Sequence, residues 1–171
     1  MLGKKYLCMF MLLAALLAAM PTTAMAAEPP PPDTVFNTAK EPQPALGPPP
    51  ADVKISTVIG GSKSNLSGPG GASAVLSAIM NYYQQYGLWW SRAGSKIDLI
   101  SGTSGAYAYA TLKQGGWASP TASCPATGTG ECTARTSYYS SSGLVIAQAD
   151  TTVYWSGGGF STATKTVTHT F

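Results

Sequence analysis

Charged side chains are scarce in this chain of 171 residues: ten Lys and Arg and seven Asp and Glu make up 10% of it. Globular proteins usually carry about 25% charged residues. A chain with so few Lys and Arg side chains lacks the cations that neutralise many phosphates, which argues against nucleic-acid binding. Because 44% of the residues are apolar, the composition also argues against a highly charged disordered chain.

Residues that support catalysis are few as well. His169 is the only histidine, and the chain lacks the Gly-x-Ser-x-Gly motif that presents a nucleophilic serine. Zinc needs three or four ligands, and beside oxidised cysteines only His169 and scattered carboxylates remain. We therefore predict no catalytic residue, no metal site and no cofactor. A small secreted hydrolase that uses Asp98, Asp150 or His169 stays open as an alternative.

No apolar run is long enough to cross a bilayer as a helix. The longest, from Leu7 to Met20, falls short of the roughly 20 residues that a membrane-spanning helix needs. It is preceded by two lysines and followed by Ala24-Met25-Ala26, whose small residues suit a signal peptidase. We predict that residues 1–26 are a signal peptide cleaved between Ala26 and Ala27. The mature chain is then secreted or periplasmic and has no transmembrane segment.

Proline is concentrated in one segment, residues 27–50, which holds nine of the 13 prolines. Each proline fixes φ and removes a hydrogen-bond donor, so this segment is predicted to be a disordered, extended tether. The remaining residues, 51–171, are predicted to form a single compact domain. They contain only seven basic and four acidic side chains but 18 Ser, 15 Thr and 17 Gly, so the surface of this domain must depend on small polar residues.

The apolar pattern of residues 51–171 predicts an α+β fold, in which one amphipathic helix packs on a mostly antiparallel sheet of about five to seven strands. Apolar residues recur at helical spacing over residues 72–86, and Gly87 follows as a candidate C-terminal cap. Period-two patterns predict the strands. These cover residues 53–59, 97–100, 106–112, 144–148, 151–155 and 161–171.

Two predicted strands have distinct faces. In residues 106–112, alanines and Leu112 alternate with Tyr107 and Tyr109, so the tyrosines share the opposite face. That tyrosine face either binds a ligand or covers a second small core. In residues 161–171, five threonines alternate along one face.

Cys124 and Cys132 are the only cysteines after the predicted signal peptide. An even pair in an exported chain, joined by a short Gly- and Pro-containing segment, predicts a disulfide bond. A redox pair would be expected to have Cys-x-x-Cys spacing, which is absent.

Aromatic residues are the most suggestive group for function. Aromatic rings with few charges nearby suit the recognition of sugars or extended peptides. We therefore predict a non-catalytic binding domain whose partner is a glycan or peptide at the cell envelope. The alternatives are the hydrolase above and a subunit of a surface assembly that oligomerises through its C-terminal strand. The candidate ligand-binding residues are Trp89, Trp90, Tyr107, Tyr109 and Trp117.

Overall fold

The computed structural model describes residues 42–60 and 64–171, all of which belong to one compact unit, Thr38–Phe171. The predicted signal peptide, its cleavage site between Ala26 and Ala27, and residues 27–41 of the predicted tether lie outside the described residues. Residues 42–50 are described, and they hydrogen-bond to the strand that follows Tyr138.

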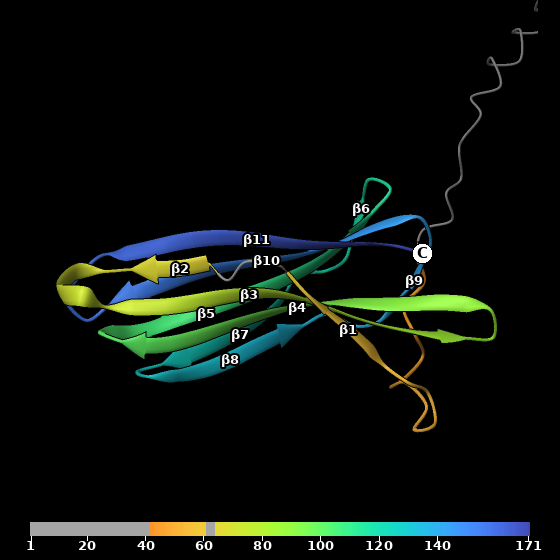
Figure 1. The fold of residues 1–171 in the computed structure, drawn as a ribbon, viewed down its shortest axis with the longest axis horizontal. Helices are drawn as coiled ribbons and strands as arrows, with labels where there is room; N and C mark the ends of the chain where they lie inside the picture. The colour runs from red at the N-terminus through yellow and green to blue at the C-terminus, as the bar shows by residue number, and fades with distance from the viewer. Residues whose placement is uncertain (1–41, 61–63) are drawn as a thin grey trace, which may run out of the picture. The chain divides into compact units, whose positions relative to one another are not determined.

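The described residues form two antiparallel β-sheets (Figure 1). Sheet A contains β1 (Ser56–Ile59), β2 (Ser64–Ser67), β3 (Ser73–Gln85), β4 (Leu88–Ser101), β8 (Gly130–Arg135) and β9 (Tyr139–Ser141). Sheet B contains β5 (Thr103–Gln114), β6 (Trp117–Ala118), β7 (Ala122–Thr127), β10 (Leu144–Trp155) and β11 (Phe160–Thr170). The two sheets share one hydrophobic core, so the architecture is a β-sandwich.

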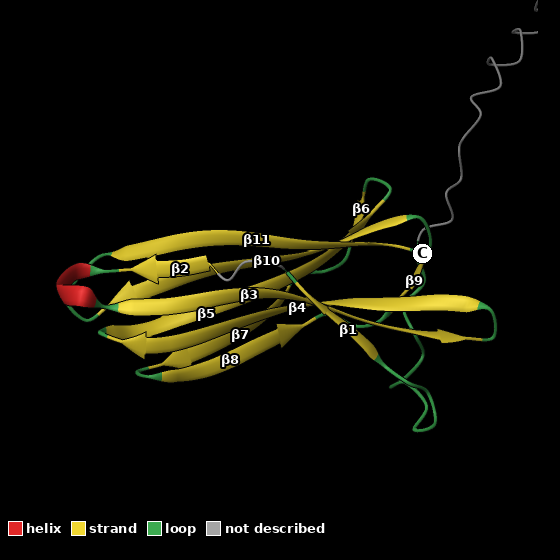
Figure 2. Cartoon of the chain, in the orientation of Figure 1, coloured by secondary structure: helices red, strands yellow, loops and turns green. Residues whose placement is uncertain are grey.

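The predicted α+β fold is wrong, because 69% of the described residues are in strands and none of them is in an α-helix. Figure 2 shows strands throughout, with one short 3₁₀ turn (Pro69–Gly71) between β2 and β3. The residues predicted as an amphipathic helix over 72–86 are the long strand β3.

The physical reason for this error lies in the pattern of β3 itself. Ala74, Leu76, Ala78 and Met80 alternate along the strand and are all buried, which is a period of two rather than 3.6. Val75 and Ile79, which supported the helical spacing, lie on the other face, and both are β-branched residues that favour strands. The next segment, β4, supplies a partner over 13 positions, which a local pattern cannot reveal.

Gly87 has a different role from the predicted helix cap. It follows Tyr86 in the two-residue turn between β3 and β4, and both residues have positive φ, 50° for Tyr86 and 76° for Gly87. Positive φ at both central positions is the geometry of a type I′ hairpin turn. The glycine therefore reverses a strand instead of ending a helix.

The core is unusually rich in alanine. Alanines line the inward faces of both sheets, and the larger buried side chains fill the space between them. The largest fully buried apolar side chains are Leu76, Met80, Ile97, Leu112, Val145 and Val153. Because alanine side chains are short, the two facing sheets can approach each other closely.

The strand predictions for residues 97–100, 106–112, 144–148, 151–155 and 161–171 are confirmed within β4, β5, β10 and β11. The predicted strand over 53–59 is confirmed in its second half by β1. The alternation in residues 106–112 is confirmed as well, since the alanines are buried and Tyr107 is exposed. The buried alanines of this strand were expected to pack against a helix. They pack against sheet A.

Candidate functional site

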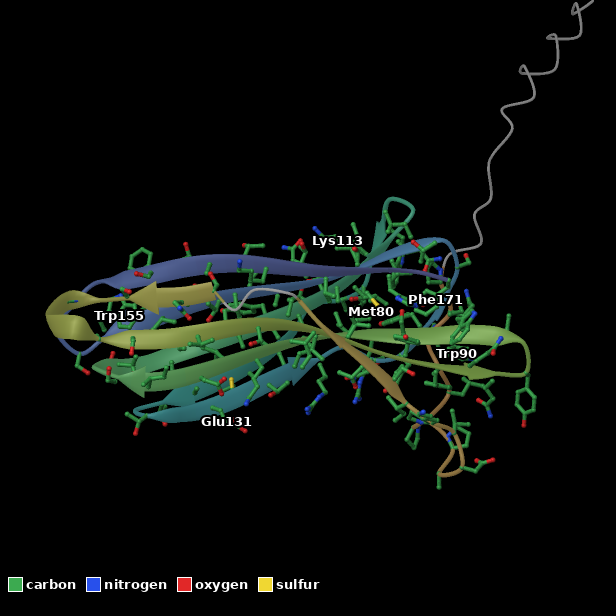
Figure 3. All side chains as sticks on the ribbon, in the orientation of Figure 1. Met80, Trp90, Lys113, Glu131, Trp155 and Phe171 are labelled. Carbon is green, nitrogen blue, oxygen red and sulfur yellow. The ribbon has the colours of Figure 1, made fainter. Side chains whose placement is uncertain are left out.

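Trp89 and Trp90 lie near the tip of the β3–β4 hairpin, at one end of the sandwich. Figure 3 labels Trp90 and Phe171 at this end and Trp155 at the opposite end. Adjacent residues of a strand point to opposite faces. Trp89 therefore contacts Tyr82 and Phe171 with its ring, whereas Trp90 stacks with Tyr83. Both indoles are half-buried.

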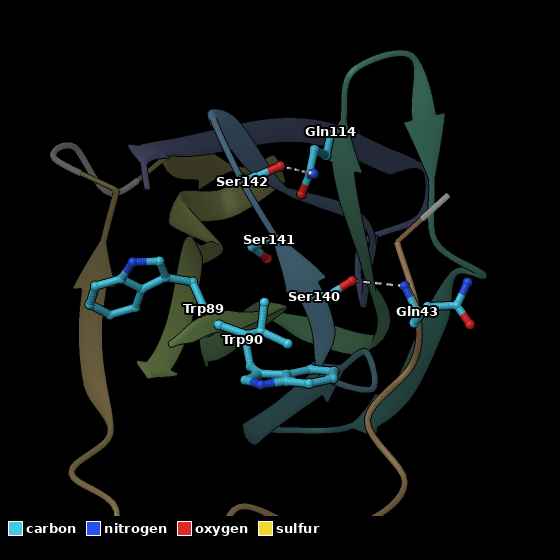
Figure 4. A pocket seen from close by; sticks show the side chains of 8 residues that line it. Gln43, Trp89, Trp90, Gln114, Ser140, Ser141 and Ser142 are labelled. Carbon is cyan, nitrogen blue, oxygen red and sulfur yellow. Dashed lines mark hydrogen bonds between the residues drawn. The ribbon is translucent and has the colours of Figure 1, made fainter. Parts of the chain in front are cut away.

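The two tryptophans nevertheless line one pocket of about 270 Å³ (Figure 4). The pairing of β9 with Trp89–Ser91 of β4 brings a run of three serines to this pocket. None of its lining residues is charged. They are Gln43, Leu88, Trp89, Trp90, Gln114, Ser140, Ser141 and Ser142.

Hydrogen bonds hold most polar groups of this pocket in place. The Nε2 of Gln114 donates to the Oγ of Ser142 at 3.3 Å, and the backbone N–H of Gln43 donates to the Oγ of Ser140 at 2.9 Å (Figure 4, dashed lines). The hydroxyls of Ser91 and Ser141 share a hydrogen bond, and Ser141 also donates to the carbonyl oxygen of Tyr139. The serines are thus fixed by neighbours on β4, β5 and the 42–45 segment.

One buried side-chain atom in the pocket has no hydrogen-bond partner among the described residues. The Oε1 of Gln114 is buried and accepts no hydrogen bond within the described residues. A buried acceptor without a donor costs about 1–3 kcal/mol. Because the atom is buried, an N–H or O–H group of a ligand can reach it only if the Gln114 side chain turns toward the pocket. Because the pocket contains no charge, the ligand it suits is neutral.

Trp117 lies beside a second hollow at the same end, of about 740 Å³. This hollow shares Gln114 and Ser142 with the first pocket and also includes Lys113. The ring of Trp117 packs edge-on against Tyr139 with centroids 4.9 Å apart. The structure therefore brings three of the five sequence-predicted aromatic residues to one end of the sandwich.

Tyr107 and Tyr109 lie elsewhere, on the outer face of sheet B. Their rings are nearly parallel, with centroids 6.2 Å apart, and Tyr107 is 44% exposed. The register places Tyr109 beside Asp150. The carboxylate of Asp150 accepts hydrogen bonds from Thr164 at 2.6 Å and Gln148 at 2.8 Å. These tyrosines line neither of the two hollows at that end.

The three groups suggested for a hydrolase are not brought together. Asp98 is on the outer face of sheet A, where it pairs with Lys96 at 3.0 Å. Asp150 is on the outer face of sheet B, and His169 stacks on Tyr82 with centroids 4.5 Å apart. Hydrogen bonds from Lys96 to Glu131 and Asp98 raise the pKa of Lys96. Over residues 42–60 and 64–171, no group of three His, Cys, Asp or Glu side chains lies close enough to hold a metal ion.

Cys124 and Cys132 lie on β7 and β8, which belong to different sheets, and both are free thiols in the structure. The Sγ of Cys132 donates to the carbonyl oxygen of Cys124 at 3.1 Å. Burial, followed by the hydrogen bond with the Cys124 side chain, raises the pKa of Cys132 to about 12. The predicted disulfide thus joins neighbouring residues of the two sheets, and it stays a prediction.

Sequence reasoning missed Gln114 and the three serines of residues 140–142. Gln114 ends a strand just before Gly115-Gly116, and the serines follow Tyr138-Tyr139 directly, but neither context marks a binding site. Their convergence depends on pairings between distant segments, so no local motif identifies them.

Comparison of the chain with protein-family models, with curated proteins and with solved structures finds no match. The part of the chain that the structure describes contains no helix with the length and apolar character of a membrane span. The protein is therefore classified by its architecture, as a two-sheet antiparallel β-sandwich with an uncharged aromatic pocket at one end.

Proposed function

We propose that this chain is an exported, non-catalytic binding module that recognises a glycan or an extended peptide at the cell envelope. The observation that carries the proposal is the pocket beside Trp89 and Trp90, which combines two indole rings, three serine hydroxyls and an unpartnered amide oxygen of Gln114. Export depends on the predicted signal peptide.

The chemistry of this pocket supports a ligand with both apolar faces and hydrogen-bonding edges. Indole rings provide large apolar contact areas at a small cost in conformational entropy. The serine hydroxyls each donate and accept, and Gln114 offers a further acceptor. Glycans and peptide backbones both present apolar surface next to O–H or N–H groups, whereas an ionic ligand would find no charged partner among the residues that line the pocket.

Screening the mature chain against neutral cell-envelope polysaccharides and a library of extended peptides tests this proposal. Trp89→Ala and Gln114→Leu are expected to weaken binding of any ligand found by about tenfold or more, because each removes a direct contact. Tyr154→Ala is the matched control, since Tyr154 is an exposed aromatic residue of the β10–β11 hairpin that lines none of the hollows. Binding that is unchanged in Trp89→Ala and Gln114→Leu contradicts the proposal.

A second candidate function is assembly through β11. This strand ends sheet B, so one of its edges has no strand partner within the described residues. Phe171 exchanges both backbone hydrogen bonds with Gly143, and bonding alternates along an antiparallel strand, so even-numbered residues such as Thr168 direct their N–H groups to the open edge. Thr168→Pro should abolish any oligomers while leaving the monomer folded. A monomeric wild-type chain at high concentration contradicts this candidate.

A further inference from the structure

The described end of the Pro-rich segment forms an isolated β-bridge with β9. Pro44 forms an antiparallel bridge with Tyr139. The N–H of Ala45 donates to the carbonyl oxygen of Tyr138 at 2.8 Å, and the N–H of Ser140 donates to the carbonyl oxygen of Gln43 at 2.9 Å. Adding an extended segment to an open sheet edge is a recurring mode of peptide recognition.

Beyond this bridge, the segment passes over aromatic residues of the β3–β4 hairpin. A hollow of about 370 Å³ lies between Ala45–Pro50 on one side and Tyr83, Tyr86 and Trp90 on the other. Tyr83 stacks with Trp90 at a centroid distance of 6.4 Å and packs edge-on against Tyr138 at 5.0 Å. Aromatic-lined grooves of this kind bind proline-rich segments, which lose little conformational entropy on binding.

The chain's own segment is held mainly by backbone hydrogen bonds near Gln43 and Ala45. Pro42 is buried, whereas Leu46 is fully exposed and Pro44 and Pro48 are exposed too. Every buried residue of the hydrophobic core lies at Leu66 or later, so residues 42–50 add nothing to that core. Segments with few buried apolar contacts open locally at a small cost in free energy. Because the hollow is unfilled, a peptide with a larger side chain has room to make contacts that Ala45 does not make.

Tyr86 is a second, independent sign that this surface meets a partner. It is 93% exposed at the tip of the hairpin and has a φ of 50°. A bulky residue in this left-handed region is uncommon, and Gly or Asn would fit the turn better. Backbone strain of this kind tends to occur at functional sites.

We propose that the edge of β9, together with Tyr83, Tyr86 and Trp90, is a binding site for uncharged, proline-containing extended peptides. Residues 42–50 occupy this site in cis. A peptide partner displaces them, pairs with Tyr138 and Ser140 through its backbone, and places apolar side chains in the hollow. The site goes beyond the proposed function: it shares Trp90 and Ser140 with the pocket but includes neither Trp89 nor Gln114.

Fluorescence anisotropy of a labelled synthetic peptide of residues 42–50 tests this inference on the full mature chain. The Ala45→Pro protein variant lacks the N–H that holds the segment in cis, and the variant keeps its whole core. Because an intramolecular competitor acts at an effective concentration near the millimolar range, Ala45→Pro should bind the peptide about tenfold more tightly than wild type.

Two controls separate pairing from non-specific adhesion. A peptide that carries the same Ala45→Pro change should not bind, because it lacks the paired N–H. Adding Tyr86→Ser to the Ala45→Pro protein should weaken binding several-fold, and adding Tyr154→Ser instead should leave it unchanged. Equal affinity of the wild-type and Ala45→Pro proteins, or of the two peptides, overturns the inference.

Amide hydrogen exchange of the wild-type protein provides a second readout that needs no variant. Saturating peptide should speed exchange at the protein's own Ala45 amide, because the cis segment is released, while the Ser140 amide stays protected by the incoming strand. Unchanged exchange at both amides in the presence of the peptide contradicts displacement. If Trp89→Ala and Gln114→Leu left ligand binding at the pocket unchanged, the proposed function would fail, but the peptide-binding and exchange results at the β9 edge would not be affected. The two proposals can therefore fail independently.

Discussion

Oxidation of Cys124 and Cys132 to a disulfide is expected to stabilise the sandwich by joining its two sheets. The two cysteines close a loop of nine residues, for which loop-closure entropy predicts a gain of about 2–3 kcal/mol. The short distance between the Sγ of Cys132 and the Cys124 carbonyl oxygen, 3.1 Å, shows that the two residues are neighbours before oxidation.

The gain should increase at alkaline pH, and the sign follows from the pKa of Cys132. Burial raises this pKa in the folded state from 9.0 to about 12. In the reduced protein, the stability that the raised pKa of Cys132 contributes is fully present below pH 9. It is lost as the pH rises toward 12, because the thiol ionises in the unfolded state before it ionises in the folded state. At pH 10 the reduced protein should have lost about 1 kcal/mol that the oxidised protein retains.

Denaturant unfolding of the oxidised and reduced forms at pH 7 and pH 10 measures both effects. Burial also raises the pKa of Tyr83 and Tyr138, but these groups affect both redox forms equally and cancel in the difference. Cys124→Ser provides the control, since its unfolding midpoint should not respond to reductant. An unchanged wild-type midpoint on addition of reductant at pH 7 would mean that no stabilising disulfide forms. An equal loss of stability in the oxidised and reduced proteins at pH 10 would mean that the Cys132 thiol does not cause it.

Three further changes test the packing, the turn and the pocket. Ala108→Leu inserts a large side chain between closely packed sheets, so thermal unfolding should show a loss of about 1–3 kcal/mol; no loss would mean that the Ala face is not tightly packed. Tyr86→Asn places at the hairpin turn a residue that adopts positive φ at a lower cost, so urea titrations should show a gain in stability of about 0.5–1 kcal/mol. Gln114→Leu removes a buried acceptor without a partner, so its stability should stay within about 1 kcal/mol of wild type; a large loss would show that Gln114 is structurally essential.

Several strands could be predicted from the sequence because their pattern is unambiguous. In residues 106–110, alanine and tyrosine alternate strictly, and the structure buries the alanines while Tyr107 is exposed and Tyr109 half-buried. The segment 72–86 failed because its apolar residues satisfy both periods at once. Only the hairpin partner, which pairs Ser73–Gln85 with β4, decides between strand and helix there.

The candidate site could be predicted from the sequence only in part. Trp89, Trp90 and Trp117 stand out by residue type, and the structure places all three at one end. The polar half of the pocket does not stand out, because it depends on β9 joining β4 about 50 residues earlier in the chain. Gln114 is an ordinary strand-end glutamine until its neighbours are known. Long-range pairing of this kind leaves no local sequence signal.

The most direct test of the central claim compares ligand binding by the wild-type, Trp89→Ala and Tyr154→Ala proteins, each at matched stability. The ligand is the best-binding neutral glycan or peptide from the screen, and calorimetry gives its affinity. We predict that Trp89→Ala loses about tenfold or more in affinity while Tyr154→Ala binds as the wild type does. Equal affinity of all three proteins would contradict the assignment of the end pocket as the binding site.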